Sequence, residues 1–237
     1  MMRLLFVASG SMEFPGILSR AEQARPARLP VDWARSARLG DHEVLLVANG
    51  AGAQRAAAAV DAAVESFRPD AVVSTGFCGA LDPDLCVADV VVGTCVTEWT
   101  DQEAGSTYPA LPVASAAAYH AGVVCSIGHV ARTAAEKRRL GASGAIAVEM
   151  EAAGVAARAH TRGLPFYCVR AVTDLAGETM ANDFNQALRS HGHFDTILIL
   201  RGAMRRPLVR LPELFRLRKR CVRAASVLGE FIANCRF

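Results

Sequence analysis

The chain has 237 residues, 52% of them hydrophobic and 21% charged, so it can bury one sizeable core and is not an intrinsically disordered polypeptide. Its net charge of +3 is uneven: ten Lys and Arg face two Glu from Arg201 onward, whereas residues 1–200 carry 16 Lys and Arg against 21 Asp and Glu. The seven cysteines form no C-x-x-C pair, and we expect reduced core thiols in a cytosolic protein.

Neither a secretory signal nor a membrane span is expected. The apolar run Leu4–Ala8 is too short for the central region of a signal peptide, so we interpret it as a first buried strand. The longest segment without a formal charge, Ala110–Gly128, contains proline, serine, tyrosine and histidine. It is too polar to cross a bilayer.

Apolar β-branched runs alternate with alanine-rich stretches, a pattern typical of a sheet with helices on both faces. The predicted strands are Leu4–Ala8, Ala34–Leu39, Glu43–Ala48, Ala71–Thr75, Asp89–Glu98, Gly122–Ile127, Ile146–Val148 and Phe166–Thr173. The predicted helices are Ala53–Phe67, Glu151–Arg162 and Met180–Arg201. The polar, proline-broken segment Arg20–Pro30 is predicted to be a loop or a frayed helix end. We therefore predict an α/β fold: a single domain with a central twisted mixed β-sheet flanked by helices.

The C-terminal segment differs from the rest, so we separate a main domain, residues 1–206, from a basic amphipathic C-terminal helix, residues 207–237. Helix is predicted from Pro212, where proline suits a first helical position. Apolar residues recur on it at spacings of three and four: Leu214, Leu217, Cys221, Ala224, Leu228, Phe231 and Cys235. Its first two turns also carry a basic cluster: Arg216, Arg218, Lys219, Arg220 and Arg223. The helix fits an anionic membrane surface, but the apolar stripe equally fits this protein's own domain or a second subunit.

Three segments place glycine or polar residues where a strand ends, which is where open α/β sheets bind ligands. The first is Asn49-Gly50-Ala51-Gly52, which a plain tight turn explains equally well. The second is AVVSTGFCGAL at residues 71–81, followed by VADVVV at residues 87–92. The third combines AVEMEA at residues 147–152 with VRAVTD at residues 169–174.

Together these segments resemble the nucleoside phosphorylase and nucleosidase family, which shows a T-G-S-x-G-like turn, a V-E-M-E motif and an R-A-[IV]-S-D motif in this order. The resemblance covers roughly Arg3 to Leu200. It implies the family's fold, cleavage of the N-glycosidic bond of a purine nucleoside, and a homodimer or higher homo-oligomer. The family's common substrates are methylthioadenosine and S-adenosylhomocysteine, and hydrolases of futalosine and of an adenosyl-hopane lipid belong to the same superfamily.

The V-E-M-E motif supplies the residues expected at the sugar. The resemblance assigns Glu151 to the ribose hydroxyls, Met150 to packing under the sugar ring and Glu149 to a supporting position. A carboxylate suits the first role because it can accept hydrogen bonds from two neighbouring hydroxyls. The alternative is a solvated helix N-terminus that is enriched in Glu for dipole reasons.

The R-A-[IV]-S-D motif supplies the expected general acid. Cleavage leaves negative charge on the purine, and the resemblance implies that Asp174 donates a proton to its five-membered ring. Thr173 stands where the family usually has Ser and is expected either to orient this acid or to cap the following turn. Gly76 and Phe77 of the glycine turn are expected to line the nucleoside pocket. The alternative for Asp174 is a helix N-cap.

The residue that would activate water departs from the family pattern. Family hydrolases typically show A-M-x-x-E after the first strand, and here the position of that Glu is occupied by Pro15. Glu13 lies two residues earlier and becomes the candidate base if the local register shifts. Without such a base, the chain would be a nucleoside-binding module that has lost catalysis.

The phosphate-binding residues of family phosphorylases are also missing. Their Arg and Ser correspond here to Ser74 and Phe77, which offer no cation and no hydroxyl after the first glycine. Water is therefore the expected acceptor, although Arg55 or Arg132 could replace the cation in a phosphorolytic enzyme.

No cofactor or metal site is expected. The chain has no P-loop and no dinucleotide-binding glycine motif, and the bare H-x-H at His191 to His193 is interpreted as surface helix. We expect a small nucleoside substrate, no nucleic-acid partner, and a cytoplasmic protein with possible peripheral contact at the inner membrane surface. A membrane-surface adaptor whose tail is the functional part is a competing interpretation.

Overall fold

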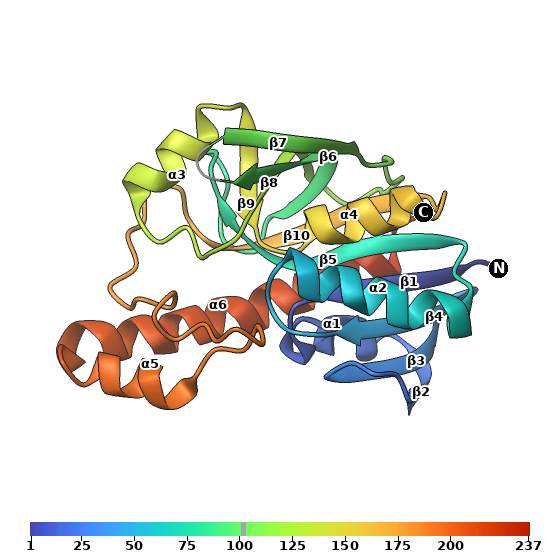
Figure 1. Ribbon diagram of the computed structural model, residues 1–237, viewed down its shortest axis with the longest axis horizontal. Coiled ribbons are helices and arrows are strands. Elements are labelled where there is room, and N and C mark those ends of the chain that lie inside the picture. The colour runs from blue at the N-terminus through green and yellow to red at the C-terminus, as the bar shows by residue number, and fades with distance from the viewer. Residues whose placement is uncertain (101–102) are drawn as a thin grey trace.

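The computed structural model describes residues 1–100 and 103–237. Within them, ten strands form one mixed sheet with helices on both sides (Figure 1). The strands are β1 (Arg3–Ala8), β2 (Glu22–Pro26), β3 (Trp33–Leu39), β4 (His42–Ala48), β5 (Ala71–Ala80), β6 (Val90–Thr100), β7 (Glu103–Pro109), β8 (His120–Ile127), β9 (Ala145–Glu149) and β10 (Phe166–Asp174). The helices are the 3₁₀ turn η1 (Ser11–Glu13), α1 (Pro15–Leu18), α2 (Ala53–Phe67), α3 (Ala134–Gly141), α4 (Ala152–Thr161), α5 (Thr196–Ala203) and α6 (Pro207–Ala233). This confirms the predicted α/β class and mixed sheet.

The strand order brings one end of four strands together. It runs β10-β6-β8-β9-β5-β1-β4-β3-β2, with β7 paired to β6. Strand β10 pairs with β5 as well as with β6, so the first five strands of this order curl into a closed ring. Strands β4, β1, β5 and β10 are parallel to their neighbours in this series. Their carboxyl ends therefore lie along the same edge.

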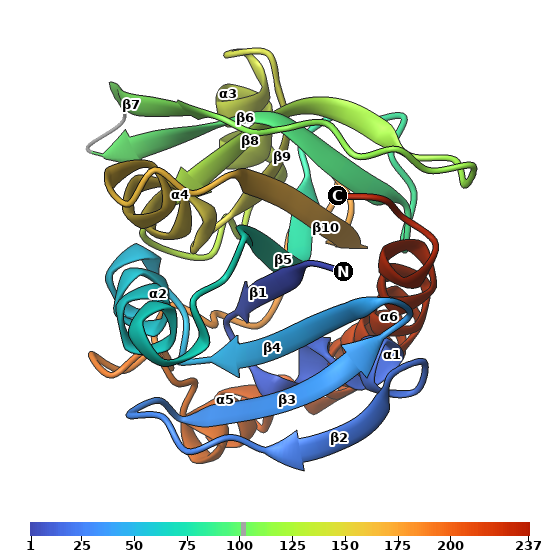
Figure 2. The same cartoon turned by 90° about the vertical axis from the view of Figure 1, so that its right-hand side faces the viewer.

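The core forms two layers, one on each face of the central strands. In β1, Leu5 and Val7 face the layer that contains α2 and α4, whereas Leu4 and Phe6 face the layer that contains α6 and the start of α1. Figure 2 shows α2 and α4 on one side of the sheet and α1 and α6 on the other. A central strand covered on both faces must be apolar at every position, which explains the unbroken hydrophobic runs in the sequence.

Two of the predicted elements are wrong. The helix predicted at Met180–Arg201 is mostly turns and bends, and α5 begins only at Thr196. Local side-chain hydrogen bonds compete with helix here, since Asp183 accepts from the backbone of Asn185 and Asp195 caps α5. The segment Arg20–Pro30, predicted to be a loop, contains the edge strand β2, where proline is tolerated.

Helix α6 begins at Pro207, five residues before the predicted start. In its C-terminal half, the predicted apolar stripe is buried in the core through Ala224, Leu228 and Phe231. The C-terminal half of the stripe therefore docks on this protein's own domain and is not available to a membrane. Among the described residues, no helix is long and apolar enough to cross a bilayer.

Helix α6 crosses α1 in direct backbone contact, which gives a stability prediction. A Cβ atom added at Gly229 would lie 2.0 Å from the carbonyl carbon of Gly16. We expect Gly229→Ala to lower the free energy of unfolding by about 1–3 kcal/mol, because α1 and α6 must move apart to make room for the added methyl group. Gly202→Ala in α5 is the control, since its added Cβ would meet only Arg210 Nη1, at 4.0 Å. Urea unfolding measures both, and equal stabilities would contradict the packing argument.

Candidate active site

The predicted site residues come together at the shared edge of the parallel strands. They come from the turn that follows β1, from the second half of β5, from the end of β9 and the two residues after it, and from the end of β10. Nearly all of their side chains are buried, with Glu13 3%, Glu151 5% and Asp174 9% exposed. With Glu149, also 5% exposed, four carboxyl groups lie in one buried region, and they need specific partners because unpaired buried charge is costly.

Glu13 is held in the site by three hydrogen-bond donors. Its Oε2 accepts from Ser9 Oγ and from the backbone N–H of Gly10, each at 2.9 Å, and its Oε1 accepts from Phe77 N–H at 2.8 Å. Gly76 has φ +130°, and a Cβ there would lie 2.3 Å from Glu13 Oε1. The glycine turn therefore makes room for this carboxylate, and the turn η1 brings Glu13 inward although Pro15 occupies the family's position.

Arg170 is a fully buried cation in β10. Its guanidinium donates to Thr75 O at 2.9 Å, to Ser74 Oγ at 2.6 Å and to Glu149 Oε2 at 2.5 Å. Burial alone would lower the pKa of Arg170, but the nearby carboxylates, Glu149 first, hold it above its ordinary value. Ser74 is thus bound to Arg170 rather than open to a ligand.

Glu149 and Glu151 have different partners. Glu149 Oε2 also accepts from the backbone N–H groups of Glu151 and Ala152 at 2.9 and 2.8 Å, which fixes the start of α4. Glu151 Oε1 accepts from Gly52 N–H at 3.1 Å, and its Oε2 lies 3.7 Å from Arg170 Nη1. Burial, followed by repulsion from Glu149, raises the pKa of Glu151 to about 8. Glu149 is a structural partner of Arg170, whereas Glu151 keeps most of its accepting capacity.

Asp174 ends β10 and forms an ion pair with Lys137 of α3, a side chain with no exposed surface. Lys137 also donates to Leu175 O at 2.8 Å. Thr173 Oγ1 donates to Asp174 Oδ1 at 3.0 Å and so orients this carboxyl group. A Cβ at Gly79 would lie 2.7 Å from Asp174 Oδ2, so the glycine turn also makes room for this second carboxyl group.

The remaining predicted residues lie beside these groups. Met150 is 9% exposed between Glu149 and Glu151, and Phe77 is half-buried with its N–H on Glu13. The structure thus brings every predicted site residue to one region: Glu13, Gly76, Phe77, Glu149, Met150, Glu151, Thr173 and Asp174.

The sequence analysis left two buried cations of this region, Arg170 and Lys137, unassigned. Arg170 lies in a quoted motif, and a lone charge in an apolar strand is a signal for a buried partner. Lys137 has no such signal, because it stands in the charged run E-K-R-R of an otherwise surface-like helix. Only the three-dimensional contact with Asp174 identifies it.

His191 and His193 are exposed as expected, but His191 lies in a turn and His193 lies just after it, so neither is in a helix. Their rings are 5.2 Å apart, and His193 Nε2 lies 2.9 Å from Asp32. Among the residues that the structure describes, no three His, Cys, Asp or Glu side chains are grouped so that they could hold a metal ion.

Comparison with known proteins identifies the family. The sequence profile of the phosphorylase superfamily matches residues 34–194, which include both acidic motifs. The chain belongs to the phosphorylase superfamily. The expected family and fold are therefore confirmed.

Superfamily relatives with assigned activities align along much of the chain. The 5'-methylthioadenosine/S-adenosylhomocysteine nucleosidase of Bacillus subtilis is 28% identical over 226 residues, which cover 84% of this chain and 97% of the relative. The enzyme of the same name from Staphylococcus aureus is 32% identical over 165 residues, 58% of this chain and 71% of the relative.

Solved structures share the fold. The S-adenosylhomocysteine nucleosidase from Streptococcus pyogenes, in complex with a nucleoside analogue, has a TM-score of 0.72 at 22% identity and covers 98% of this chain and 97% of its own. The futalosine hydrolase of Helicobacter pylori has the same TM-score at 15% identity, with coverages of 98% and 95%.

The raised pKa of Glu151 predicts a pH effect on stability. The folded protein holds this proton up to about pH 8, whereas an ordinary Glu releases it near 4.5, so the stabilisation is fully present below pH 4.5 and is lost as pH rises through 8. Glu151→Gln removes the group. We expect the stability of the wild type relative to this variant to fall steadily between pH 5 and pH 8.5.

Urea unfolding at several pH values measures this difference. Glu65→Gln, on the exposed side of α2, is the control and should run parallel to the wild type. A Glu151→Gln curve that is also parallel would mean that Glu151 titrates as an ordinary carboxyl group.

Proposed function

We propose that this member of the phosphorylase superfamily hydrolyses the N-glycosidic bond of a purine nucleoside, a 5'-modified adenosine, and releases the free base. The observation that carries the proposal is the placement of Glu13 and Asp174 against the glycine turn of β5, with Glu151, held by Gly52 N–H, close enough to Glu13 to interact electrostatically. Glu13 lies against Gly76 and Asp174 lies against Gly79, so the two groups approach the turn three residues apart. The names of the relatives support methylthioadenosine or S-adenosylhomocysteine as the substrate type.

The chemistry divides among the three carboxyl groups. Breaking the bond leaves positive charge on the sugar and negative charge on the purine, so protonation of the leaving base lowers the barrier. We assign this proton to Asp174. Glu13, oriented by three donors, accepts a proton from the attacking water. Glu151 accepts hydrogen bonds from the ribose hydroxyls, with Met150 under the sugar, and these bonds favour its ionised form.

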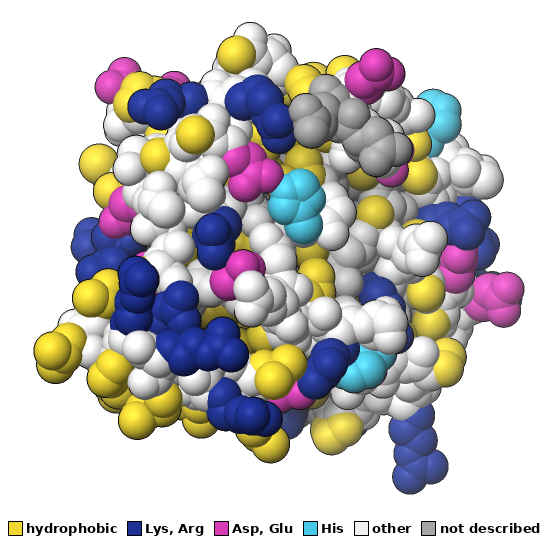
Figure 3. Space-filling view, turned by 60° about the vertical axis from the view of Figure 1, so that its left-hand side comes forward, with side chains coloured by type: hydrophobic (Ala, Val, Ile, Leu, Met, Phe, Trp, Pro, Cys, Tyr) yellow, Lys and Arg dark blue, Asp and Glu magenta, His cyan; other side chains and the backbone are white. Residues whose placement is uncertain are grey.

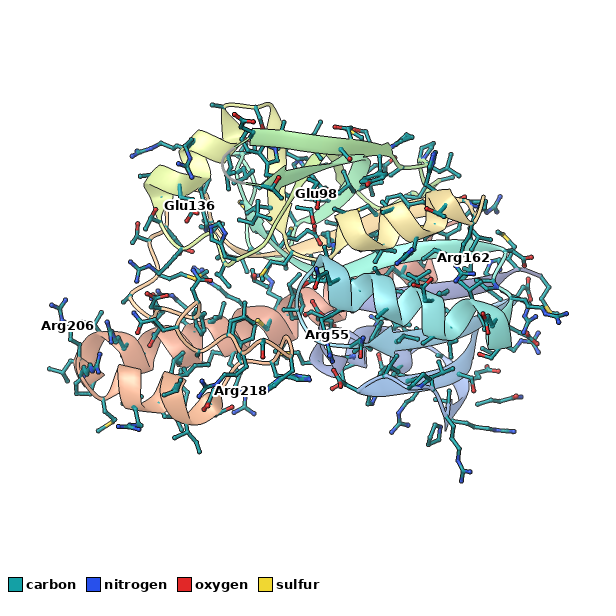
Figure 4. The ribbon with its side chains drawn as sticks, viewed as in Figure 1. Arg55, Glu98, Glu136, Arg162, Arg206 and Arg218 are labelled. Carbon is teal, nitrogen blue, oxygen red and sulfur yellow. The ribbon has the colours of Figure 1, made fainter. Side chains whose placement is uncertain are left out.

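Water is a better acceptor than phosphate in this site. The two cations that could replace the missing phosphate ligand have other partners, since Arg55 pairs with Asp32 at 2.8 Å and Arg132 pairs with Asp183 at 3.1 Å. Arg55, labelled in Figure 4, also donates to Asn49 O at 2.5 Å. A phosphate dianion would have to break these contacts, whereas a water molecule would not.

Lys137 gives Asp174 a source of protons. Its ammonium group donates to Asp174 and is sealed from solvent. As negative charge develops on the purine, Lys137 passes a proton to the Asp174 carboxylate and Asp174 delivers it to the base. The Lys137 amine is then neutral, and after the base leaves it regains a proton through Asp174, whose side chain is 12% exposed.

The wider setting of the enzyme is part of the proposal. We infer a cytoplasmic homodimer or higher homo-oligomer, as the family resemblance implies, with peripheral contact at the inner membrane surface. The alternative is a nucleoside-binding module without catalysis. Release of the free base from a bound nucleoside distinguishes the enzyme from this module.

Incubation with methylthioadenosine in phosphate-free buffer tests the function. We expect release of free adenine at a rate that added phosphate does not change. Asp174→Asn should lower turnover by about 100-fold or more, because an amide cannot deliver a proton. Adenine that appears only with phosphate would identify a phosphorylase, and tight binding without product would identify a binding module.

The role of Lys137 is tested by changing the leaving group. We expect Lys137→Met to lower turnover of a purine nucleoside by about 100-fold. A 4-nitrophenyl riboside needs no protonation to depart, so its cleavage should change little. Lys219→Met, an exposed change on α6, is the control. If both substrates lose activity equally, Lys137 acts only in structural support of the site.

A further inference from the structure

Helix α5 and the first half of α6 form a helical hairpin that projects from the sheet (Figure 1). The hairpin is closed by Arg210, whose Nη1 donates to Gly202 O at 2.6 Å. Of the eleven large hydrophobic residues that are exposed in the described part of the chain, eight lie between Phe194 and Val222. Exposed apolar side chains gathered in one element, rather than scattered, mark an interaction surface.

The apolar residues follow the geometry of the hairpin. Ile197, Leu200 and Met204 are three and four residues apart, so they share one face of α5. Leu208 and Val209 lie at the start of α6 and are 91% and 57% exposed. Nothing in the described structure covers these side chains.

Unpaired cations surround this apolar group. Between Thr196 and Arg223 the sequence has nine Lys and Arg and a single acid, Glu213, which is buried and accepts from the backbone of Ala181 and Asn182. Seven of the cations are exposed and form no salt bridge with a described residue, but Arg216 lies close enough to Glu178 to lower the pKa of that carboxyl group. The other six are Arg201, Arg205, Arg206, Arg218, Lys219 and Arg223. Figure 4 shows Arg206 at the outer end of the hairpin and Arg218 along it. Figure 3 shows hydrophobic side chains at the lower left of the molecule with Lys and Arg beside them.

We propose that one surface of this hairpin docks the protein on an anionic lipid bilayer. This hairpin surface consists of the six cations and of Ile197, Leu200, Met204, Leu208, Val209 and Phe215. Arginine and lysine reach the lipid phosphates while the apolar side chains enter the boundary between headgroups and acyl chains. The surface differs from the apolar stripe of the sequence analysis, which is buried in the core.

Charge and composition favour a bilayer over other occupants. A second copy would bring its own arginines against these arginines, since a two-fold interface pairs a surface with itself. A nucleic acid would satisfy the cations but would leave Leu208 and its neighbours in water. An anionic bilayer satisfies both groups at once.

The surface adjoins the proposed active site. The first half of α6 lines a cavity through Leu217 and Arg220, and Asp174 lies on the wall of the same cavity. Docking would thus hold the site close to the bilayer. The docking proposal does not depend on the proposed function, because binding to lipid is measured without substrate.

Vesicle sedimentation of the full-length chain tests the proposal. We expect binding to vesicles of phosphatidylcholine with about one third phosphatidylglycerol at low salt, release as salt is raised, and weak binding to phosphatidylcholine alone. The triple variant Arg205→Gln, Arg206→Gln and Arg218→Gln should bind about 100-fold more weakly, as expected from three cations at the surface. Leu208→Ser with Val209→Ser should also weaken binding at unchanged charge.

The matched control removes the same charge elsewhere: Arg25→Gln, Arg28→Gln and Arg138→Gln, all exposed. It should keep nearly full binding, and all variants should keep the wild-type melting temperature and cleavage of a small nucleoside. The proposal is overturned if the wild type ignores anionic vesicles, or if the control loses as much binding as the hairpin variant. Dimerisation that Leu208→Ser abolishes, or salt-sensitive binding to an oligonucleotide or an acidic peptide but not to vesicles, overturns it as well.

Discussion

The site depends on the hydrogen bonds and ion pair that the buried guanidinium of Arg170 makes with β5 and β9. A cation removed from water is stable only if carboxylates and carbonyl oxygens replace its hydration. Here β5 supplies Thr75 O and Ser74 Oγ, and β9 supplies Glu149. Arg170 thus connects β10 with β5 and β9, so the motifs at the ends of these strands lie close together. They do so although about 95 residues separate Thr75 from Arg170 in the sequence. Loss of Arg170 would leave buried carboxylates without a counter-charge.

The carboxyl groups of the site differ in their distance from Arg170 and in their hydrogen-bond partners. Glu149 uses Oε2 on Arg170 and on the first amides of α4, so it is fixed in a structural role. Glu151 is only 3.7 Å from the same cation and shares its environment with Glu149, which helps to raise its pKa. Asp174 is removed from this cluster and pairs with Lys137. Groups of one chemical type thus acquire different tasks from their partners.

The sequence was sufficient for the fold class and for naming acidic residues that the structure brings together, because both depend on local patterns. Unbroken apolar strands predict buried parallel sheet, and the V-E-M-E and R-A-V-T-D segments carry their own signature. Contacts between distant segments leave no such pattern. The Lys137 contact with Asp174 spans 37 residues, and η1 compensates for Pro15 by a local turn. The helix predicted at Met180–Arg201 failed because side-chain hydrogen bonds override its helical propensity.

Helix α6 connects the exposed hairpin surface with the cavity beside Asp174. Its C-terminal half is core, whereas its first half holds the segment that follows Asp174. Arg220 makes two hydrogen bonds to Glu178, which lower the pKa of that carboxyl group to about 2, and Glu213 accepts from the backbone of Ala181 and Asn182. The segment has no regular secondary structure of its own, so these contacts determine its position. The wall of the cavity beside Asp174 is therefore set by the same helix that presents the basic and apolar residues to the outside.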